Sequence, residues 1–296
     1  MKKNKRVFVC SNAGLDYIEY PKDMVILRSV IHFGSDELYQ DYIEMSAETF
    51  YNRIADKPND VPKTSYVSIG LMQEYFEQAI EDGIEEVLIV TIAKPLSGLN
   101  EALKHQAKNY EDKLKVTVFD SKTIAYAEAF MALEGDRLLN EENYTMNETI
   151  KVLEQIRDNN NLYFAVDTLK YLVVNGRLGK LQGTLGTLLK IKPLLSFDKD
   201  GNVVTLEKIK TSHKALNRVL EKYIEETKDK NVLTYISHAH SIDALNYLVA
   251  EIKKVYPERK VIETYLTPVV GAHTGPKAIG LGYIDMDNVH YKKWIK

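Results

Sequence analysis

The feature that most constrains the fold is an alternation of short apolar runs with helix-like segments through the first half of the chain. The run Val87–Ile92 reads VLIVTI, as expected of a strand that is buried on both faces. Runs rich in Val and Ile at Val7–Cys10, Met24–Val30 and Val116–Phe119 predict further strands. Strands separated by helices imply right-handed crossovers, so we expect a parallel sheet with helices on both sides.

Helix starts can be located between these strands from capping residues and turn signals. The predicted helices begin at Ala47 after Ser46, after Ser68, at about Gly98, after Asp120-Ser121 and at Met146.

The second half of the chain has a different pattern, with hairpin signals among its helices. Asp198–Gly201 is a hairpin turn signal, with glycine where positive φ is needed. The predicted strands are Leu162–Val166, the hairpin pair Leu194–Phe197 and Val203–Ile209, and a last hairpin of Tyr283–Asp285 with His290–Trp294. We therefore predict a two-domain α/β protein, with an N-terminal parallel-sheet domain at 1–159 and a C-terminal α+β domain with a mixed or antiparallel sheet at 160–296.

Charge and composition exclude several classes of protein. The 296 residues carry 39 Lys and Arg against 42 Asp and Glu, so the basic excess typical of nucleic-acid binding is absent. Cys10 is the only cysteine, which excludes an intrachain disulfide and fits a reducing compartment. The N-terminal apolar run is too short for a signal peptide, and no run approaches a membrane span. We expect a cytoplasmic protein with no stable membrane insertion.

The loop after Val87–Ile92 is the first candidate site, because ligands gather at the carboxyl ends of parallel strands. Ser97 and Gly98 stand at the start of the next helix, where free amides and the helix dipole attract an anion. Ser97 is equally suited to capping its own helix. Thr64 and Ser65, in PKTSYVSIG, form a second hydroxyl pair, for which turn formation is the competing explanation.

The glycine-rich segment GAHTGPKAIGLG, from Gly271 to Gly282, is the third candidate site. We expect His273 and Thr274 to lie on a tight loop, with Pro276 in the first turn of a following helix. Such a histidine can donate a hydrogen bond to a ligand, or be satisfied by backbone alone. Arg177, in NGRLGK, can clamp a carboxylate or phosphate, although surface ion pairing is the commoner use of arginine.

Several patterns that would indicate an enzyme or a cofactor site fail. GRLGKLQGTLG lacks the spacing of a phosphate-binding loop, and no G-x-G-x-x-G follows a strand. His238 and His240 would share one face of a strand, but no third ligand accompanies them, so no metal is expected. Cys10 ends a buried strand and is expected to be a structural thiol rather than a nucleophile. No catalytic residue is therefore predicted.

Taken together and in order, these segments resemble the DegV family of bacterial fatty-acid-binding proteins. The resemblance runs from about Arg6 to Ile284 and is most specific in LKYLVVNGRLGKLQGTLGTLLKIKPLLSF and GNVVTLEKIKTSHKAL. PKTS, LSGL and GAHTGPKAIGLG stand where that family has its ligand-contact segments.

The resemblance implies that one long-chain fatty acid lies in a tunnel between the two domains and that no cofactor is needed. The carboxylate would meet residues from all three segments, with Arg177 near the headgroup or a partner surface. Carried over by position, those residues are Thr64, Ser65, Ser97, Gly98, His273 and Thr274.

The resemblance also implies a partner, an ATP-dependent fatty acid kinase that makes an acyl-phosphate for phospholipid synthesis. The chain would then be a carrier, or the subunit of such a kinase that does not bind nucleotide, and not itself an enzyme. Two alternatives remain: a phosphotransferase or hydrolase that uses the same anion site with His273 as acid or base, and a lipid-sensing regulatory protein.

Three positions depart from the family pattern. A D-S-T segment reads Cys10-Ser11-Asn12 here, so its acid is lost. Tyr42 replaces a glycine, and Leu99 replaces a threonine that would supply a headgroup hydroxyl. Preference for chain length or saturation does not follow from the sequence.

Overall fold

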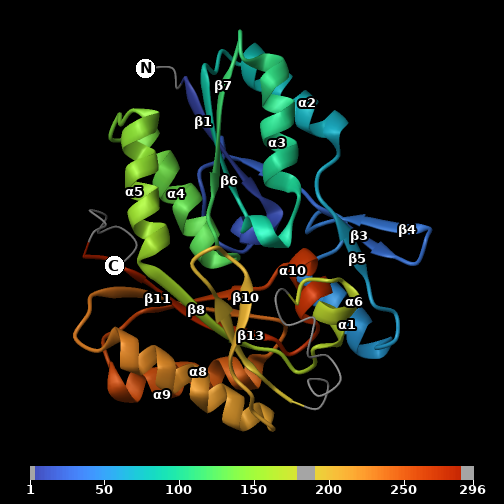
Figure 1. Cartoon of the computed structure of the whole chain (residues 1–296), viewed down its shortest axis with the longest axis vertical. Coiled ribbons are helices and arrows are strands. Elements are labelled where there is room, and N and C mark those ends of the chain that lie inside the picture. The colour runs from blue at the N-terminus through green and yellow to red at the C-terminus, as the bar shows by residue number, and fades with distance from the viewer. Residues whose placement is uncertain (1–3, 179–190, 288–296) are drawn as a thin grey trace.

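A four-stranded parallel sheet forms the core of the N-terminal half, as predicted (Figure 1). The computed structural model describes residues 4–178 and 191–287. The strand order is β2 (Val25–Leu27), β1 (Lys5–Cys10), β6 (Glu86–Thr91), β7 (Lys115–Asp120), and every pairing is parallel. The central strands β1 and β6 are buried because helices cover both faces of the sheet.

The helices divide between the two faces as a doubly wound fold requires. On one face lie α2 (Ile69–Glu81) and α3 (Leu99–Ala107), and on the other α4 (Tyr126–Asn140) and α5 (Met146–Asp158). Ser68 caps α2 as predicted, accepting a hydrogen bond from the Leu71 amide at 3.2 Å. The helix predicted from Ser121 begins five residues later at Tyr126, because Ala125 has φ 57° and cannot continue a helix.

The predicted strand Met24–Val30 is wrong in extent, because the chain leaves the parallel sheet after Leu27. Arg28 turns aside to pair with Asp16 at 2.8 Å. The following residues form a separate three-stranded antiparallel sheet that the sequence did not predict. Its order is β4 (Glu37–Gln40), β3 (Val30–Phe33), β5 (Lys63–Ser65), and α1 (Ala47–Asp56) lies between β4 and β5 in the chain.

A six-stranded mixed sheet forms the C-terminal half. Its order is β10 (Val203–Glu207), β9 (Leu194–Phe197), β8 (Asn160–Ala165), β13 (Ile279–Asp285), β11 (Val232–His238), β12 (Val261–Tyr265). The β9–β10 hairpin is confirmed, and α8 (Ser212–Thr227) and α9 (Ile242–Val255) pack on one face of the sheet. The strand predicted at His290–Trp294 lies outside the described residues.

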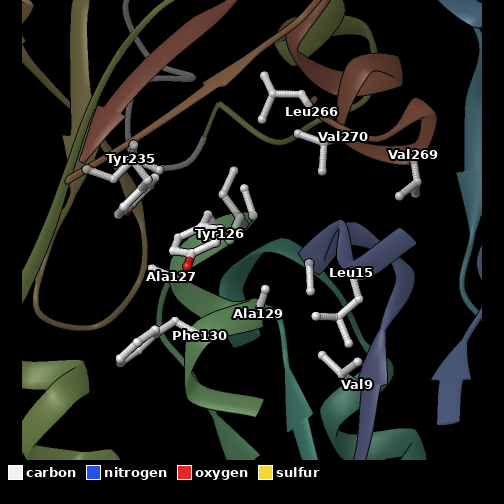
Figure 2. Close-up of a cluster of buried hydrophobic side chains, with 14 of the residues drawn as sticks. Val9, Leu15, Tyr126, Ala127, Ala129, Phe130, Tyr235, Leu266, Val269 and Val270 are labelled. Carbon is white, nitrogen blue, oxygen red and sulfur yellow. The ribbon is translucent and has the colours of Figure 1, made fainter. Parts of the chain in front are cut away.

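One hydrophobic core joins the two halves (Figure 2). Tyr126 and Phe130 from α4 lie in it with Tyr235 from β11, and the Tyr126 and Tyr235 ring centroids are 5.2 Å apart. Tyr51 of α1 adds a hydrogen bond of 2.8 Å to the Leu266 carbonyl. The chain passes from the first half to the second between α5 and β8, where the domain boundary was placed; the boundary itself stays a prediction. No helix in the described ranges is long and apolar enough to cross a membrane.

Candidate functional site

A cavity of about 300 Å³ lies between the carboxyl edge of the parallel sheet and the C-terminal half. All seven residues predicted for the site line it: Thr64, Ser65, Ser97, Gly98, Arg177, His273 and Thr274. Most of its remaining wall is apolar: Ile92, Leu96, Leu99, Ile124, Phe164, Leu172, Phe197, Val203, Val269 and Val270. A small polar cluster in an apolar cavity is typical of a site that fixes one end of an apolar ligand.

Thr64 and His273 meet although 209 residues separate them in the chain. The Thr64 hydroxyl and His273 Nε2 lie 2.8 Å apart. Thr64 is held by β5, and His273 is in the last turn of the helix α10 (Pro268–Thr274). The expectation of a loop around His273, and of a helix starting at Pro276, is therefore wrong: the helix precedes that proline and β13 follows it.

Close packing explains why a glycine-rich segment forms a helix here. A Cβ on Gly271 would lie 2.6 Å from the Tyr51 hydroxyl, so only glycine lets α10 approach α1. Gly275 ends the helix with φ 76° and would carry a Cβ 2.5 Å from the Tyr171 ring. Asn175 then ties the region together, donating to the Pro62 carbonyl at 3.2 Å and the Ala272 carbonyl at 2.9 Å.

His273 is neutral at neutral pH. Burial, with the positive charge of Arg177 as a second cause, lowers the pKa of His273 to about 4. Its second ring nitrogen, Nδ1, is buried without a hydrogen-bond partner among the described residues. The site therefore offers an anion an uncharged imidazole rather than an imidazolium.

Ser97 follows a short 3-10 turn, Lys94–Leu96, at the carboxyl end of β6. Its hydroxyl accepts a hydrogen bond of 3.2 Å from the amide of Leu99, the first residue of α3. The N-cap position itself is Gly98, so Ser97 supports the helix start from one residue earlier than a capping residue would. The same side chain lines the cavity, and a hydroxyl that accepts one bond still has a proton to donate. The first amides of a helix lack partners within it, and Gly98 and Leu99 at the start of α3 both line the cavity.

Arg177 reaches across from the C-terminal half to the Ser97 loop. Its Nε donates to the Leu96 carbonyl at 3.2 Å, and its Nη1 donates to the Asn175 carbonyl at 2.5 Å. Within the described ranges no carboxylate lies at ion-pair distance from this guanidinium, so surface ion pairing does not explain it. Arg177 instead lines the cavity, where its side chain is partly exposed.

Two predicted residues line the cavity with hydroxyls that are engaged elsewhere. The Ser65 hydroxyl lies 2.8 Å from His32 Nε2, since neighbours on a strand point to opposite faces. The Thr274 hydroxyl donates to the Val270 carbonyl at 3.2 Å. Thr64, Ser97 and His273 are thus the better-placed polar groups.

Asn12, Ser29 and Tyr66 also line the cavity, and the sequence did not single them out. Asn12 lies two residues after the end of β1 and Ser29 two residues after the end of β2, so both stand at the carboxyl edge of the parallel sheet. The rule that ligands gather at this edge could have found them if it had been applied to each strand rather than to β6 alone.

The β9–β10 hairpin supplies one wall of the cavity. Phe197 and Val203 line it, and Phe197 stacks on Phe164 with ring centroids 5.5 Å apart. Gly201, at the hairpin tip, has φ 82°, and a Cβ there would lie 2.9 Å from the Ala93 Cβ. The hairpin of the second half therefore rests directly on the loop after β6 in the first half.

The departures from the family pattern have local explanations. Tyr42 has φ 67°, a backbone conformation that favours the glycine of the family pattern, and its ring packs edge-on against Tyr17 at 5.4 Å. Leu99 is buried and adds apolar wall where a threonine would add a hydroxyl. Cys10 is a buried free thiol, and burial raises its pKa well above the usual range, in keeping with a structural role.

His238 and His240 do not form a metal site with other residues of the described chain. Both rings instead lie beside Tyr265, with centroid distances of 4.6 and 6.5 Å. In residues 4–178 and 191–287 no three histidine, cysteine, aspartate or glutamate side chains are grouped to hold a metal ion.

The fold and the site together define an α/β protein with a parallel and a mixed sheet, and with a largely apolar cavity that a few polar side chains line. The family model described as "Uncharacterised protein, DegV family" matches residues 11–286. A DegV domain-containing protein of Clostridium acetobutylicum is 30% identical over 272 residues, which cover 92% of this chain and 94% of the relative. The chain belongs to the DegV family, as its sequence motifs indicated.

Solved structures agree on the fold. The crystal structure of DegV from Bacillus subtilis, described as a fatty acid binding protein, matches with a TM-score of 0.84 and 28% identity, over 96% of this chain and 99% of that one. The Streptococcus pneumoniae fatty acid kinase B3 protein loaded with linoleic acid matches with a TM-score of 0.78 over 95% and 99% of the two chains. Its 17% identity shows the shared fold.

Proposed function

We propose that this protein binds one long-chain fatty acid, with the carboxylate at Thr64, Ser97 and His273 and the acyl chain along the apolar wall. The observation that carries the proposal is that these three side chains, from separate elements, line one largely apolar cavity, in which Thr64 and His273 are in hydrogen-bond contact. The description of the Bacillus subtilis relative as fatty acid binding supports it.

In such a complex the acyl chain and the carboxylate contribute to binding in different ways. Burying an acyl chain contributes about 0.8 kcal/mol per methylene, so the tail supplies the affinity. The carboxylate then needs only hydrogen-bond donors, which avoids the desolvation cost of a buried ion pair. Arg177 lies at the mouth, where its partial exposure lets it attract the carboxylate while water still solvates the charge.

We further propose that the bound carboxylate is presented to an ATP-dependent fatty acid kinase. Ser65, Tyr66 and Gly98 are exposed, so the polar end of the cavity opens at the surface. One carboxylate oxygen would attack the γ-phosphoryl group of ATP on the kinase, giving acyl-phosphate and ADP. This chain would hold and orient the acid, with no cofactor of its own, in the cytoplasm where ATP and the kinase are found.

Ligand recovery tests the binding step. Native mass spectrometry of the purified protein, followed by lipid extraction, should recover a fatty acid at about one per chain. A protein that carries no lipid and binds none when offered palmitic or oleic acid would remove the proposal. The enzyme alternative predicts turnover of a phosphorylated substrate by the chain alone, and the regulator alternative predicts lipid binding without transfer to a kinase.

Substitutions test the site. Ser97→Ala and His273→Ala should each lower acyl-phosphate formation with the partner kinase by about tenfold or more, because each removes a hydrogen bond to a charged group. Ser68→Ala, which removes a serine hydroxyl that caps α2 outside the cavity, is the matched control. Unchanged turnover in both site variants, with thermal unfolding like that of the parent, would contradict the assignment.

A further inference from the structure

Asn12 and Ser29 are two further polar residues of the cavity wall, next to the proposed carboxylate site. They lie at the carboxyl ends of neighbouring strands β1 and β2, and both line the cavity. Each is deeply buried, with 5% of Asn12 and 6% of Ser29 exposed. Neither belongs to the segments that the proposed function uses.

The bonding of these side chains leaves one polar atom of each unused. Asn12 Nδ2 donates to the carboxyl group of Glu128, a fully buried residue of α4. The backbone amide of Ser29 is satisfied by the Ser11 hydroxyl at 3.2 Å. Asn12 Oδ1 and Ser29 Oγ have no hydrogen-bond partner among the described residues, although both side chains line the cavity.

An unsubstituted acyl chain would leave both atoms unsatisfied, which is costly in a buried place. A ligand hydroxyl group matches them, because it can donate to Asn12 Oδ1 and accept from Ser29 Oγ at once. A keto group lacks the proton for the first bond, and a methyl branch can make neither.

We infer that Asn12 and Ser29 recognise a hydroxyl group on the ligand, so that the preferred ligand is a hydroxy fatty acid. This rests on the proposed function, since it names the class of fatty acid that the same cavity takes.

The position of the hydroxyl group follows from strand pairing. Ser29 immediately precedes β3, where Val30 pairs with Ser65 and Ile31 pairs with Thr64. Ser29 is therefore close to the strand that carries the proposed carboxylate ligand Thr64. The hydroxyl would sit near the carboxyl end of the acid, on its second or third carbon.

Competition binding with matched ligands tests the inference. Dissociation constants are measured for palmitic, 2-hydroxypalmitic, 3-hydroxypalmitic and 3-methylpalmitic acids on the full chain. At least one hydroxy acid should bind about tenfold more tightly than palmitic acid, and the methyl acid should not. Equal or weaker binding of both hydroxy acids, with palmitic acid still bound, would overturn the inference and leave the proposed function standing. Failure of all four acids to bind would remove both.

Variants assign the preference to its residues. Ser29→Ala and Asn12→Leu should each abolish most of the preference for the hydroxy acid while palmitic acid still binds. Ile124→Val, which trims the same cavity without touching a polar group, should leave the ratio of dissociation constants unchanged. Asn12→Leu also removes the hydrogen-bond partner of the buried Glu128 and can prevent folding. In that case Ser29→Ala alone tests the inference. A preference for the hydroxy acid that survives Ser29→Ala would contradict the inference.

Discussion

At the scale of single residues, Asp41 places a carboxyl group in a buried position with little to stabilise its negative charge. Asp41 is fully buried, and its carboxyl oxygens form no well-aligned hydrogen bond with the described residues. Burial raises its pKa to about 7; the charge of Asp16 adds to the shift, while Ser11 and Arg28 oppose it. The carboxyl group is therefore half ionised near neutral pH.

Because the pKa of Asp41 is higher in the folded state, the contribution of this residue to stability should fall as pH rises. The unfolded chain releases this proton near pH 4 and the folded chain near pH 7, so the contribution of Asp41 to the free energy of unfolding falls across that interval. Asp41→Asn removes the ionisation, and its stability relative to the parent should be on the order of 2 kcal/mol more favourable at pH 8 than at pH 5. Urea unfolding at both pH values measures this difference.

The matched control is Asp229→Asn, the same substitution at an exposed position. A difference between pH 5 and pH 8 that is the same in both variants would show that Asp41 does not carry the effect.

The residues that line the site were predictable from the sequence, but the hydrogen bonds between them were not. Ser97 stands at a helix start by local rules alone, and the structure keeps it there. The bond between Thr64 and His273 depends on how β5 and α10 pack, which no local pattern records. Asn12 was visible only as a departure from a family motif, and its contact with Glu128 needs the tertiary fold.

At the scale of elements, α10 shows how packing overrides local preference. Glycine disfavours helices, so Gly271 predicted a loop. In the structure the absent side chain is what allows the helix to lie against Tyr51, and the packing outweighs the intrinsic cost.

Two helical glycines should respond in opposite ways to alanine. Gly271→Ala forces a Cβ to within 2.6 Å of the Tyr51 hydroxyl, and overpacking of this kind should lower the free energy of unfolding by about 1–3 kcal/mol. Gly70→Ala, in α2, meets nothing within 4 Å and should raise it by roughly 0.5–1 kcal/mol. Chemical denaturation of both variants gives the comparison, and equal effects would contradict the packing argument.

The β9–β10 hairpin allows a similar comparison at turns. Gly201→Ala combines positive φ with a Cβ only 2.9 Å from Ala93, so it should lower both thermal stability and fatty acid affinity by displacing the cavity wall. Gly34→Ala also has positive φ, at 63°, but open space around it. It should cost backbone strain of about 1 kcal/mol and leave affinity unchanged. Loss of fatty acid affinity in both variants would show that the contact between Gly201 and Ala93 is not the cause.

Elements with strong apolar patterns were predictable, and polar ones were not. The buried strand at Val87–Ile92 was located to within a residue of β6. The strands β4 and β5 read ELYQ and KTS, which carry no apolar alternation, so the three-stranded sheet went unseen. These strands form because β3 lies between them. Its buried side chains hold it in place, and it offers backbone hydrogen bonds to β4 on one edge and β5 on the other.

At the scale of the whole molecule, the shared core couples the two halves. Tyr126 of the first half packs on Tyr235 of the second, and Asn175 and Arg177 bond to backbone of the first half from the second. The proposed boundary at 159–160 therefore separates two sheets that share buried surface.

Equilibrium unfolding should consequently be a single cooperative transition. Circular dichroism and limited proteolysis across a urea titration should give coincident midpoints, because neither half buries its apolar face alone. A fatty acid held at one hundred times its dissociation constant should add about 2.7 kcal/mol to the free energy of unfolding. Two separated transitions, of which the ligand shifts only one, would mean that the halves fold independently.

The cavity wall draws on residues from Asn12 to Thr274, so it is complete only when both the N-terminal sheet and α10 are in place. The helix α10, which carries His273, is followed by the central strand β13 alone among the described elements. A chain cut before α10 therefore lacks His273, and a chain cut between α10 and β13 lacks the strand that joins β8 to β11. The fraction of protein that carries lipid would thus measure how much of the chain still has α10 and β13.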